Sequence, residues 1–174
     1  MELKKRVISE EAAALAADDQ DQALLDAAIQ ALERVYAPER HTVGCALRTV
    51  SGKIYVGVNI KACGYGPCAE TIAIGNAFTT GDHQLSAIVA VKRSDDGTAY
   101  KIVSPCGNCR QLIVDYAPDT AIIYADGAEV RKARAATLLP GHFQTRLTER
   151  PLLHLNGNGK TNGHAVRKSL EREP

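Results

Sequence analysis

Two proline–cysteine pairs, Pro67-Cys68 and Pro105-Cys106, each stand at the start of a segment with helical character. The sequence predicts helices over 68–79 and 106–116, because proline is tolerated in the first turn of a helix. A third cysteine, Cys109, follows three residues after the second pair. The fold therefore decides whether the thiols at these two helix starts lie together in one site or apart.

Length and composition limit the remaining possibilities. The chain has 174 residues, 45% of them hydrophobic, which suffices for one core. We expect one domain over 1–150, including an N-terminal helical segment, and a flexible polar tail over 151–174. A net charge of +1 makes nucleic acid an improbable partner. No apolar run approaches the roughly 20 residues of a membrane span, and the acidic N-terminal segment does not resemble a signal peptide, so we expect a cytoplasmic protein.

Strand-forming and helix-forming segments alternate along the chain. Periodicity predicts a helix over 21–36, a hairpin of strands 43–50 and 54–60, and buried strands at 85–91 and 121–124. A short strand-like pair at 102–103 precedes the second proline–cysteine pair, and segment 128–139 fits neither period. The alternation predicts an α/β fold of three layers around a mixed sheet.

The cysteines favour a metal site. An odd number of them, five, in a chain without an export signal argues against a disulfide scaffold. Cys68, Cys106 and Cys109 are the candidate ligands, and Zn²⁺ is the expected metal because it prefers thiolates. Three protein ligands leave the fourth position to water, as in catalytic zinc sites. Glu70, two residues after a ligand, is the candidate catalytic base.

Two points stay open on the residues alone. A structural zinc site would need a fourth ligand, which Cys45 or Cys63 could supply, although Cys45 lies in an apolar strand and suits a core. Arg110 directly follows a candidate ligand. It could donate to a ligand sulfur from the second shell, or it could be a solvated surface arginine.

These motifs resemble the cytidine deaminase family over most of residues 41–143. The spacing is most similar to the blasticidin-S deaminases, since nine residues separate Asn59 from Cys68. The resemblance implies a three-layer α/β/α fold around a five-stranded mixed sheet, usually assembled as a homotetramer. The matching segments are His41-Thr-Val-Gly-Cys-Ala-Leu47, Gly57-Val-Asn59, Pro67-Cys-Ala-Glu70, Ser104-Pro-Cys-Gly-Asn-Cys-Arg-Gln111 and Leu138-Leu-Pro-Gly-His-Phe143.

The resemblance also implies an activity. It is the zinc-dependent hydrolytic deamination of a cytidine-type nucleoside to the uridine-type product and ammonia, as in pyrimidine salvage. Glu70 would carry the protons. A small-molecule pyrimidine nucleoside would then be the partner, with Asn59 holding a sugar hydroxyl, Ala69 and the loop at Ser104 orienting the base, and Tyr65 adding an aromatic wall.

Two residues depart from the family pattern. Lys61 stands where ordinary cytidine deaminases have a sugar-binding carboxylate, and His41 stands where an aromatic residue stacks on the base. An ammonium donates hydrogen bonds but accepts none, so Lys61 could meet a hydroxyl oxygen or an anionic group. One alternative substrate is therefore an antibiotic nucleoside such as blasticidin S.

A further alternative is a non-catalytic, zinc-stabilised binding domain. It could bind nucleic acid through the basic run 131–134, although three charges without neighbouring aromatics more often form a solvated face.

Overall fold

The computed structural model describes residues 7–8 and 19–144. The predicted tail over 151–174, the domain boundary at residue 150 and most of the N-terminal segment lie outside the described residues. The elements in chain order are β1 (Val7–Ile8), α2 (Asp19–Val35), β2 (Val43–Thr49), β3 (Ile54–Val58), α3 (Ala69–Thr79), β4 (Leu85–Arg93), β5 (Ala99–Val103), α4 (Gly107–Tyr116), β6 (Ala121–Asp126), β7 (Glu129–Arg134) and the 3-10 helix η1 (Ala135–Leu138). The helices and strands predicted from periodicity are confirmed to within a few residues at each end.

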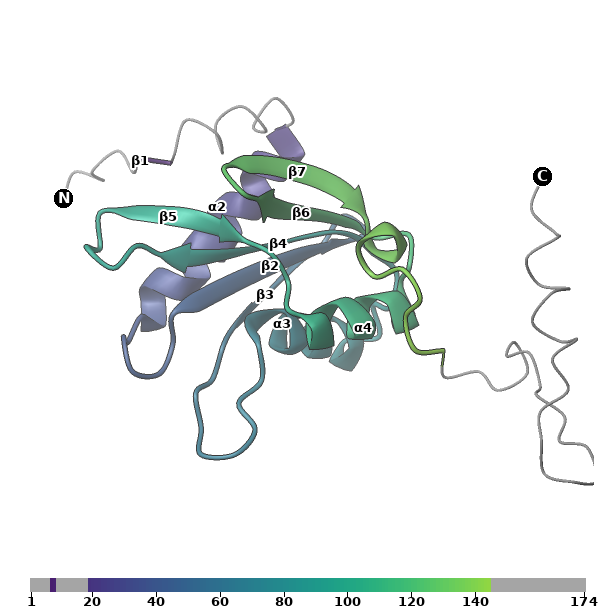
Figure 1. The fold of residues 1–174 in the computed structure, drawn as a ribbon, viewed down its shortest axis with the longest axis horizontal. Helices are drawn as coiled ribbons and strands as arrows, with labels where there is room; N and C mark the ends of the chain where they lie inside the picture. The colour runs from purple at the N-terminus through teal and green to yellow at the C-terminus, as the bar shows by residue number, and fades with distance from the viewer. Residues whose placement is uncertain (1–6, 9–18, 145–174) are drawn as a thin grey trace, which may run out of the picture. The chain divides into compact units, whose positions relative to one another are not determined.

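The strands of the described residues form one mixed sheet (Figure 1). β2 pairs antiparallel with β3 on one side and with β4 on the other. β4 then runs parallel to β6, and β6 pairs antiparallel with β7. The second half of β4 instead pairs antiparallel with β5, beside which β1 runs parallel. The parallel pairing of β4 and β6 is made by a crossover through α4, as expected for an α/β fold.

The sheet has seven strands in the described residues, so the expected number of five is wrong. After the turn at 94–97 the chain folds back along β4, and the whole of Ala99–Val103 becomes a strand. β7 is the segment whose periodicity was ambiguous. It lies at an edge with most of its side chains exposed, so no apolar alternation marks it in the sequence.

Helices cover both faces of the sheet, as the three-layer prediction required (Figure 1). The α2 face holds alternate strand residues such as Ala46 and Val89. The opposite face, which packs against α3 and α4, holds the intervening residues Cys45, Leu47 and Ile88. Because both faces are buried, β2 and β4 are continuous apolar runs in the sequence.

No helix in the described part of the chain is long and apolar enough to cross a membrane.

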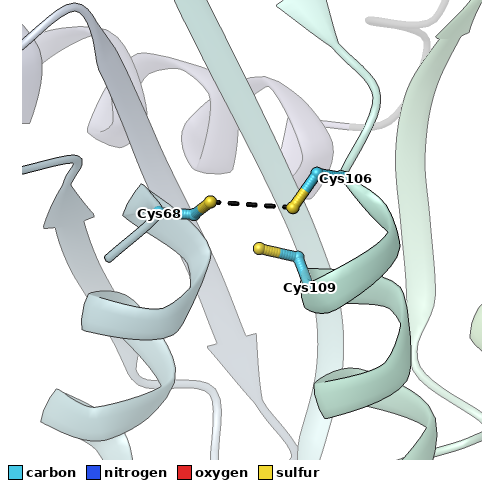
Figure 2. Close-up of side chains that lie close together, drawn as sticks. All are labelled: Cys68, Cys106 and Cys109. Carbon is cyan, nitrogen blue, oxygen red and sulfur yellow. Dashed lines mark hydrogen bonds between the residues drawn. The ribbon is translucent and has the colours of Figure 1, made fainter. Parts of the chain in front are cut away.

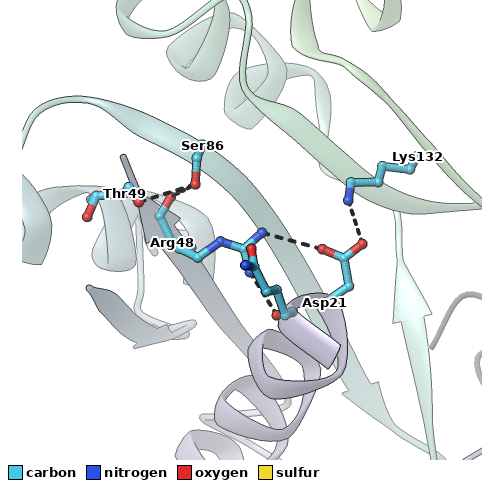
Figure 3. A network of polar contacts seen from close by, with 6 residues as sticks. Asp21, Arg48, Thr49, Ser86 and Lys132 are labelled. Carbon is cyan, nitrogen blue, oxygen red and sulfur yellow. Dashed lines mark hydrogen bonds and ion pairs between the residues drawn. The ribbon is translucent and has the colours of Figure 1, made fainter. Parts of the chain in front are cut away.

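A buried carboxylate fixes α2 to the sheet (Figure 3). Asp21 is only 5% exposed, and its Oδ2 lies 2.5 Å from the Lys132 Nζ on β7. Its Oδ1 lies 3.5 Å from the Arg48 Nη2 on β2. Arg48 also donates from Nη1 to the carbonyl of Gln20 at 2.8 Å. One acidic group therefore connects the first turns of α2 with two strands that are far apart in the sequence.

We predict that Asp21→Asn destabilises the protein by about 2 kcal/mol, because it leaves two partly buried cations without their carboxylate. Urea unfolding followed by circular dichroism measures the loss as a lower midpoint at unchanged slope. Asp95→Asn, in an exposed turn, is the matched control and should move the midpoint very little. Equal midpoints for the two variants would contradict this role for Asp21.

Candidate active site

The first turn of α3 lies directly on strand β3 at Gly57. A Cβ atom at this glycine would be 2.5 Å from both the carbonyl oxygen of Ala69 and the amide nitrogen of Ala73. Real Cβ atoms do not come so close to backbone, so only glycine allows the helix to approach the strand this closely. The position of the α3 start, with Cys68 and Glu70, therefore depends on a residue of the neighbouring strand.

Small side chains continue this row across the sheet. Gly57 is paired with Cys45, and Cys45 is paired on its other side with Ala90. Directly paired residues point to the same face, here the face covered by α3 and α4. Cys45 is fully buried, and burial together with the negative charge of Glu70 raises the pKa of its thiol. The row leaves room for the Glu70 carboxyl between the helix start and the sheet.

Three cysteine sulfurs converge between α3 and α4 (Figure 2). Cys68 and Cys106 immediately precede the two helices, and Cys109 lies in the first turn of α4. The Sγ atoms of Cys68 and Cys106 are 3.6 Å apart. All three sulfurs lie within 4.8 Å of one another, and all are free thiols. The structure thus brings together the three thiols that the sequence singled out as ligands.

The sulfur cluster fits a tetrahedral zinc ion. Zinc–sulfur bonds of about 2.3 Å place two sulfurs on one tetrahedral ion about 3.8 Å apart, close to the observed separation of Cys68 and Cys106. Cys45 and Cys63 are not part of the cluster formed within the described residues. A closed site with four cysteines therefore has no fourth thiol in this cluster.

The helix starts affect the three thiols differently. Burial raises the pKa of Cys68 and of Cys109, and the neighbouring Glu70 raises both further. Burial also opposes ionisation of Cys106, but hydrogen bonds from the backbone amide and the thiol of Cys109, from the thiol of Cys68 and from the backbone amide of Asn108 outweigh it and lower the pKa of this thiol. Free amides at a helix start stabilise a thiolate in this way. A cation in the cluster would favour the thiolate form of all three residues.

Glu70 is a buried carboxyl group beside the cluster. It is 6% exposed and lies with Ala90, Val103 and Pro105 around a small apolar cavity. Burial raises its pKa, although a backbone amide and the thiol of Cys109 donate hydrogen bonds that oppose the shift. A raised pKa makes the carboxylate a stronger base than an ordinary glutamate, which suits it to accept a proton.

An open groove leads away from Cys68 along the loop that follows β3. The Asn59 side chain is fixed in its wall, because its Oδ1 accepts hydrogen bonds of 2.8 Å from the amides of Thr42 and Val43. This leaves the Asn59 NH₂ group available as a donor. His41 lies beside it, with Nδ1 2.8 Å from the Asn59 carbonyl oxygen. The residues lining the groove are Asn59, Ile60, Lys61, Ala62, Gly66, Pro67 and Cys68.

Three other residues predicted for substrate binding, Ala69, Ser104 and Tyr65, lie close in the chain to the cysteines of the cluster. They differ in exposure and in hydrogen bonding. Ala69 is fully buried beneath the helix start. The Ser104 hydroxyl donates to the carbonyl of Ala125, so its side chain already has a partner within the protein. Tyr65 is 70% exposed, and its hydroxyl accepts a hydrogen bond of 3.4 Å from Asn108 on α4. The loop carrying Tyr65 therefore reaches across to the helix that carries two of the thiols.

Arg110 does not donate to a ligand sulfur, which was one of the two roles considered for it. Among the described residues its guanidinium donates to two carbonyl oxygens, those of Pro105 at 2.9 Å and Leu138 at 3.1 Å, and not to a sulfur. The planar guanidinium can reach two acceptors at once. It therefore fastens the loop before Cys106 to the 3-10 helix η1, and supports the cluster through the backbone.

The basic run on β7 has acidic partners. Arg131 pairs with Asp126 and Glu129, and Lys132 pairs with Asp21. Arg134 contacts Asp119. These charges are neutralised within the fold, so the run does not form the uncompensated basic surface that binds nucleic acid.

Comparison with known proteins agrees with this geometry. Residues 18–125 match the model of the family described as "Cytidine and deoxycytidylate deaminase zinc-binding region". The chain belongs to this cytidine deaminase family.

Individual relatives within the family extend over most of the fold. A blasticidin-S deaminase of Bacillus cereus is 38% identical over 126 residues, which cover 70% of this chain and 90% of the relative. A cytidine deaminase of Halalkalibacterium halodurans is 34% identical over 127 residues, with 70% and 92% covered. The crystal structure of cytidine deaminase from Burkholderia pseudomallei superposes with a TM-score of 0.59 at 32% identity, covering 70% of this chain and 98% of that chain.

Two features of the site were not identified from the sequence. Gly57 was recognised only as part of a family segment, and its contact with α3 could not be seen without the fold. The hydrogen bond between Tyr65 and Asn108 joins residues 43 positions apart. A glycine inside a strand of otherwise large β-branched and aromatic residues is the one available signal, because it often marks a close backbone approach.

We predict that Gly57→Ala costs about 2 kcal/mol of stability and lowers the bound zinc per chain, since the new methyl group must push the α3 start away from the sheet. Gly75→Ala is the matched control. Gly75 lies on α3, the helix that contacts Gly57, with nothing within 4 Å of the added atom, and its replacement should stabilise the protein by about 0.5 kcal/mol. Thermal unfolding and metal analysis of both variants distinguish them; full zinc content in Gly57→Ala would refute this role.

We also predict that Cys106→Ser loses most of its bound zinc, whereas Cys63→Ser keeps it. Both thiols are exposed, but only Cys106 belongs to the sulfur cluster. Removing one of three thiolates should weaken metal binding strongly because hydroxyl oxygen is a poor zinc ligand. Zinc per chain after dialysis gives the answer, and loss from Cys63→Ser would mean that the ligand set is different.

Proposed function

We propose that the protein is a zinc-dependent hydrolytic deaminase of cytidine-type nucleosides. The observation that carries this proposal is the buried Glu70 carboxyl beside three convergent thiols. Three thiol ligands would leave the fourth position of a tetrahedral zinc ion to water. A structural zinc site has no need of a proton carrier at this place. The cytidine deaminase relatives support the same chemistry.

Cys68, Cys106 and Cys109 would hold the metal. When bound, zinc would supply Lewis acidity that lowers the pKa of a water toward 7. Glu70 accepts a proton from the attacking water and donates it to the ring nitrogen next to the amino-bearing carbon. Glu70 then delivers the second proton of the water to the departing amine. The carbon–nitrogen bond breaks, the water oxygen becomes the carbonyl oxygen, and ammonia leaves.

The groove would bind the sugar. The Asn59 NH₂ group is held in position by the two hydrogen bonds to its Oδ1 and can donate to a sugar hydroxyl. The Ala69 backbone and the loop at Ser104 would orient the base, and Tyr65 and His41 would flank the entrance. Such prior positioning lowers the entropy lost when substrate and carboxyl group are brought together.

A second candidate substrate is an antibiotic nucleoside of the blasticidin S type. Two observations favour it: the 38% identity to a blasticidin-S deaminase, and an ammonium group, that of Lys61, in the groove wall. We also propose a cytoplasmic location and assembly as a homotetramer.

We predict that Glu70→Gln lowers kcat for cytidine by at least about a thousandfold, since the amide cannot carry protons. The variant should keep its zinc, because Glu70 is not a ligand in this proposal. Ultraviolet absorbance follows the loss of the cytosine chromophore, and metal analysis runs in parallel. Unchanged turnover in Glu70→Gln, or no turnover in the zinc-loaded wild type with any cytosine nucleoside, would overturn the proposed function.

A further inference from the structure

The groove beside the sulfur cluster has a distinct electrostatic character. Cys68, from the sulfur cluster, lines it together with Asn59 and Lys61. Lys61 is the only charged side chain among the residues that line it. A substrate that enters this groove with its reacting base at the cysteines would therefore meet a single positive charge in the groove wall.

The ammonium group of Lys61 is held in place and still available. Its Nζ donates one hydrogen bond of 3.1 Å to the carbonyl of Pro38, and an ammonium has three donors. Within the described residues no acidic partner is found for Lys61, whereas Arg48, Arg131 and Lys132 on the strands each have one. A carbonyl partner positions the cation without neutralising it.

The backbone around Lys61 is fixed as well. Its amide donates to the carbonyl of Arg40 at 3.1 Å, which joins the loop after β3 to the turn before β2. His41 contacts the Asn59 carbonyl from the same turn. Arg40 adds a second exposed positive charge there, and Glu39 is the one acidic residue of this turn. The groove wall around Lys61 is therefore fixed by hydrogen bonds to the turn before β2.

We infer that Lys61 is a specificity-determining residue that selects cytosine nucleosides carrying an anionic group, a carboxylate or a phosphate, on the sugar. This inference rests on the proposed deaminase function and names its substrate class. A partly anchored ammonium in the wall of the groove can form a charge-assisted hydrogen bond with such a group, and it offers nothing comparable to a neutral sugar. Asn59, beside it, can serve any sugar hydroxyl.

The test compares kcat/KM for cytidine, cytidine 5′-monophosphate and the 5′-carboxylate of cytidine at low salt. The wild type should prefer at least one anionic nucleoside over cytidine by about tenfold. Lys61→Gln should abolish this preference, and Lys61→Glu should reverse it. Lys53→Gln is the matched control, an exposed lysine eight residues earlier, just before the other end of β3, and should keep the wild-type preference. The better anionic substrate shows whether a phosphate or a carboxylate is recognised.

Equal kcat/KM for neutral and anionic nucleosides, or a preference that survives in Lys61→Gln, would overturn the inference. Absence of turnover with every nucleoside would overturn the proposed deaminase function instead. In that event, calorimetric binding of uridine and uridine 5′-monophosphate to wild type and to Lys61→Gln still decides the question. Tighter binding of the phosphate that depends on Lys61 supports the inference, and equal binding contradicts it.

Discussion

The contact between the start of α3 and Gly57 determines where the chemistry of this protein takes place. The backbone of Ala69 and Ala73 lies so close to β3 that no side chain fits between them. Glu70 is thereby buried above the sheet, while Cys68 stays at the mouth of the groove. If α3 began farther from the sheet, the Glu70 carboxyl group would be hydrated and the three thiols would lie farther apart.

Electrostatics then decides what this arrangement can hold. A buried carboxyl group and three thiols would repel one another if all were ionised, and burial raises the pKa values of Glu70, Cys68 and Cys109 accordingly. Backbone amides at the α4 start favour the thiolate of Cys106 but not of the whole set. A bound divalent cation would supply the missing charge. The thiol ligands and the Glu70 carboxyl would then depend on the same ion.

Local signals in the sequence predicted the helices that carry the cysteines well, because the helices, their first turns and the cysteine spacing are short-range properties. The convergence of Cys68 with Cys106 followed from the two matching helix starts and is confirmed. The predicted number of strands was wrong, and the carbonyl partners of Arg110 were not foreseen, since both depend on which distant segment comes alongside. Gly57 illustrates the same limit: its role lies in a contact with another element and not in its neighbours along the chain.

X-ray absorption at the zinc edge of the purified protein tests the central claim most directly, because it counts the atoms around the metal. Three sulfur ligands and one oxygen ligand are predicted, the oxygen marking the open position next to Glu70. Replacement of Cys63 should leave the spectrum unchanged. Four sulfur ligands would show a closed structural site, and fewer than three would show that Cys68, Cys106 and Cys109 do not bind one ion together; either result would contradict the account.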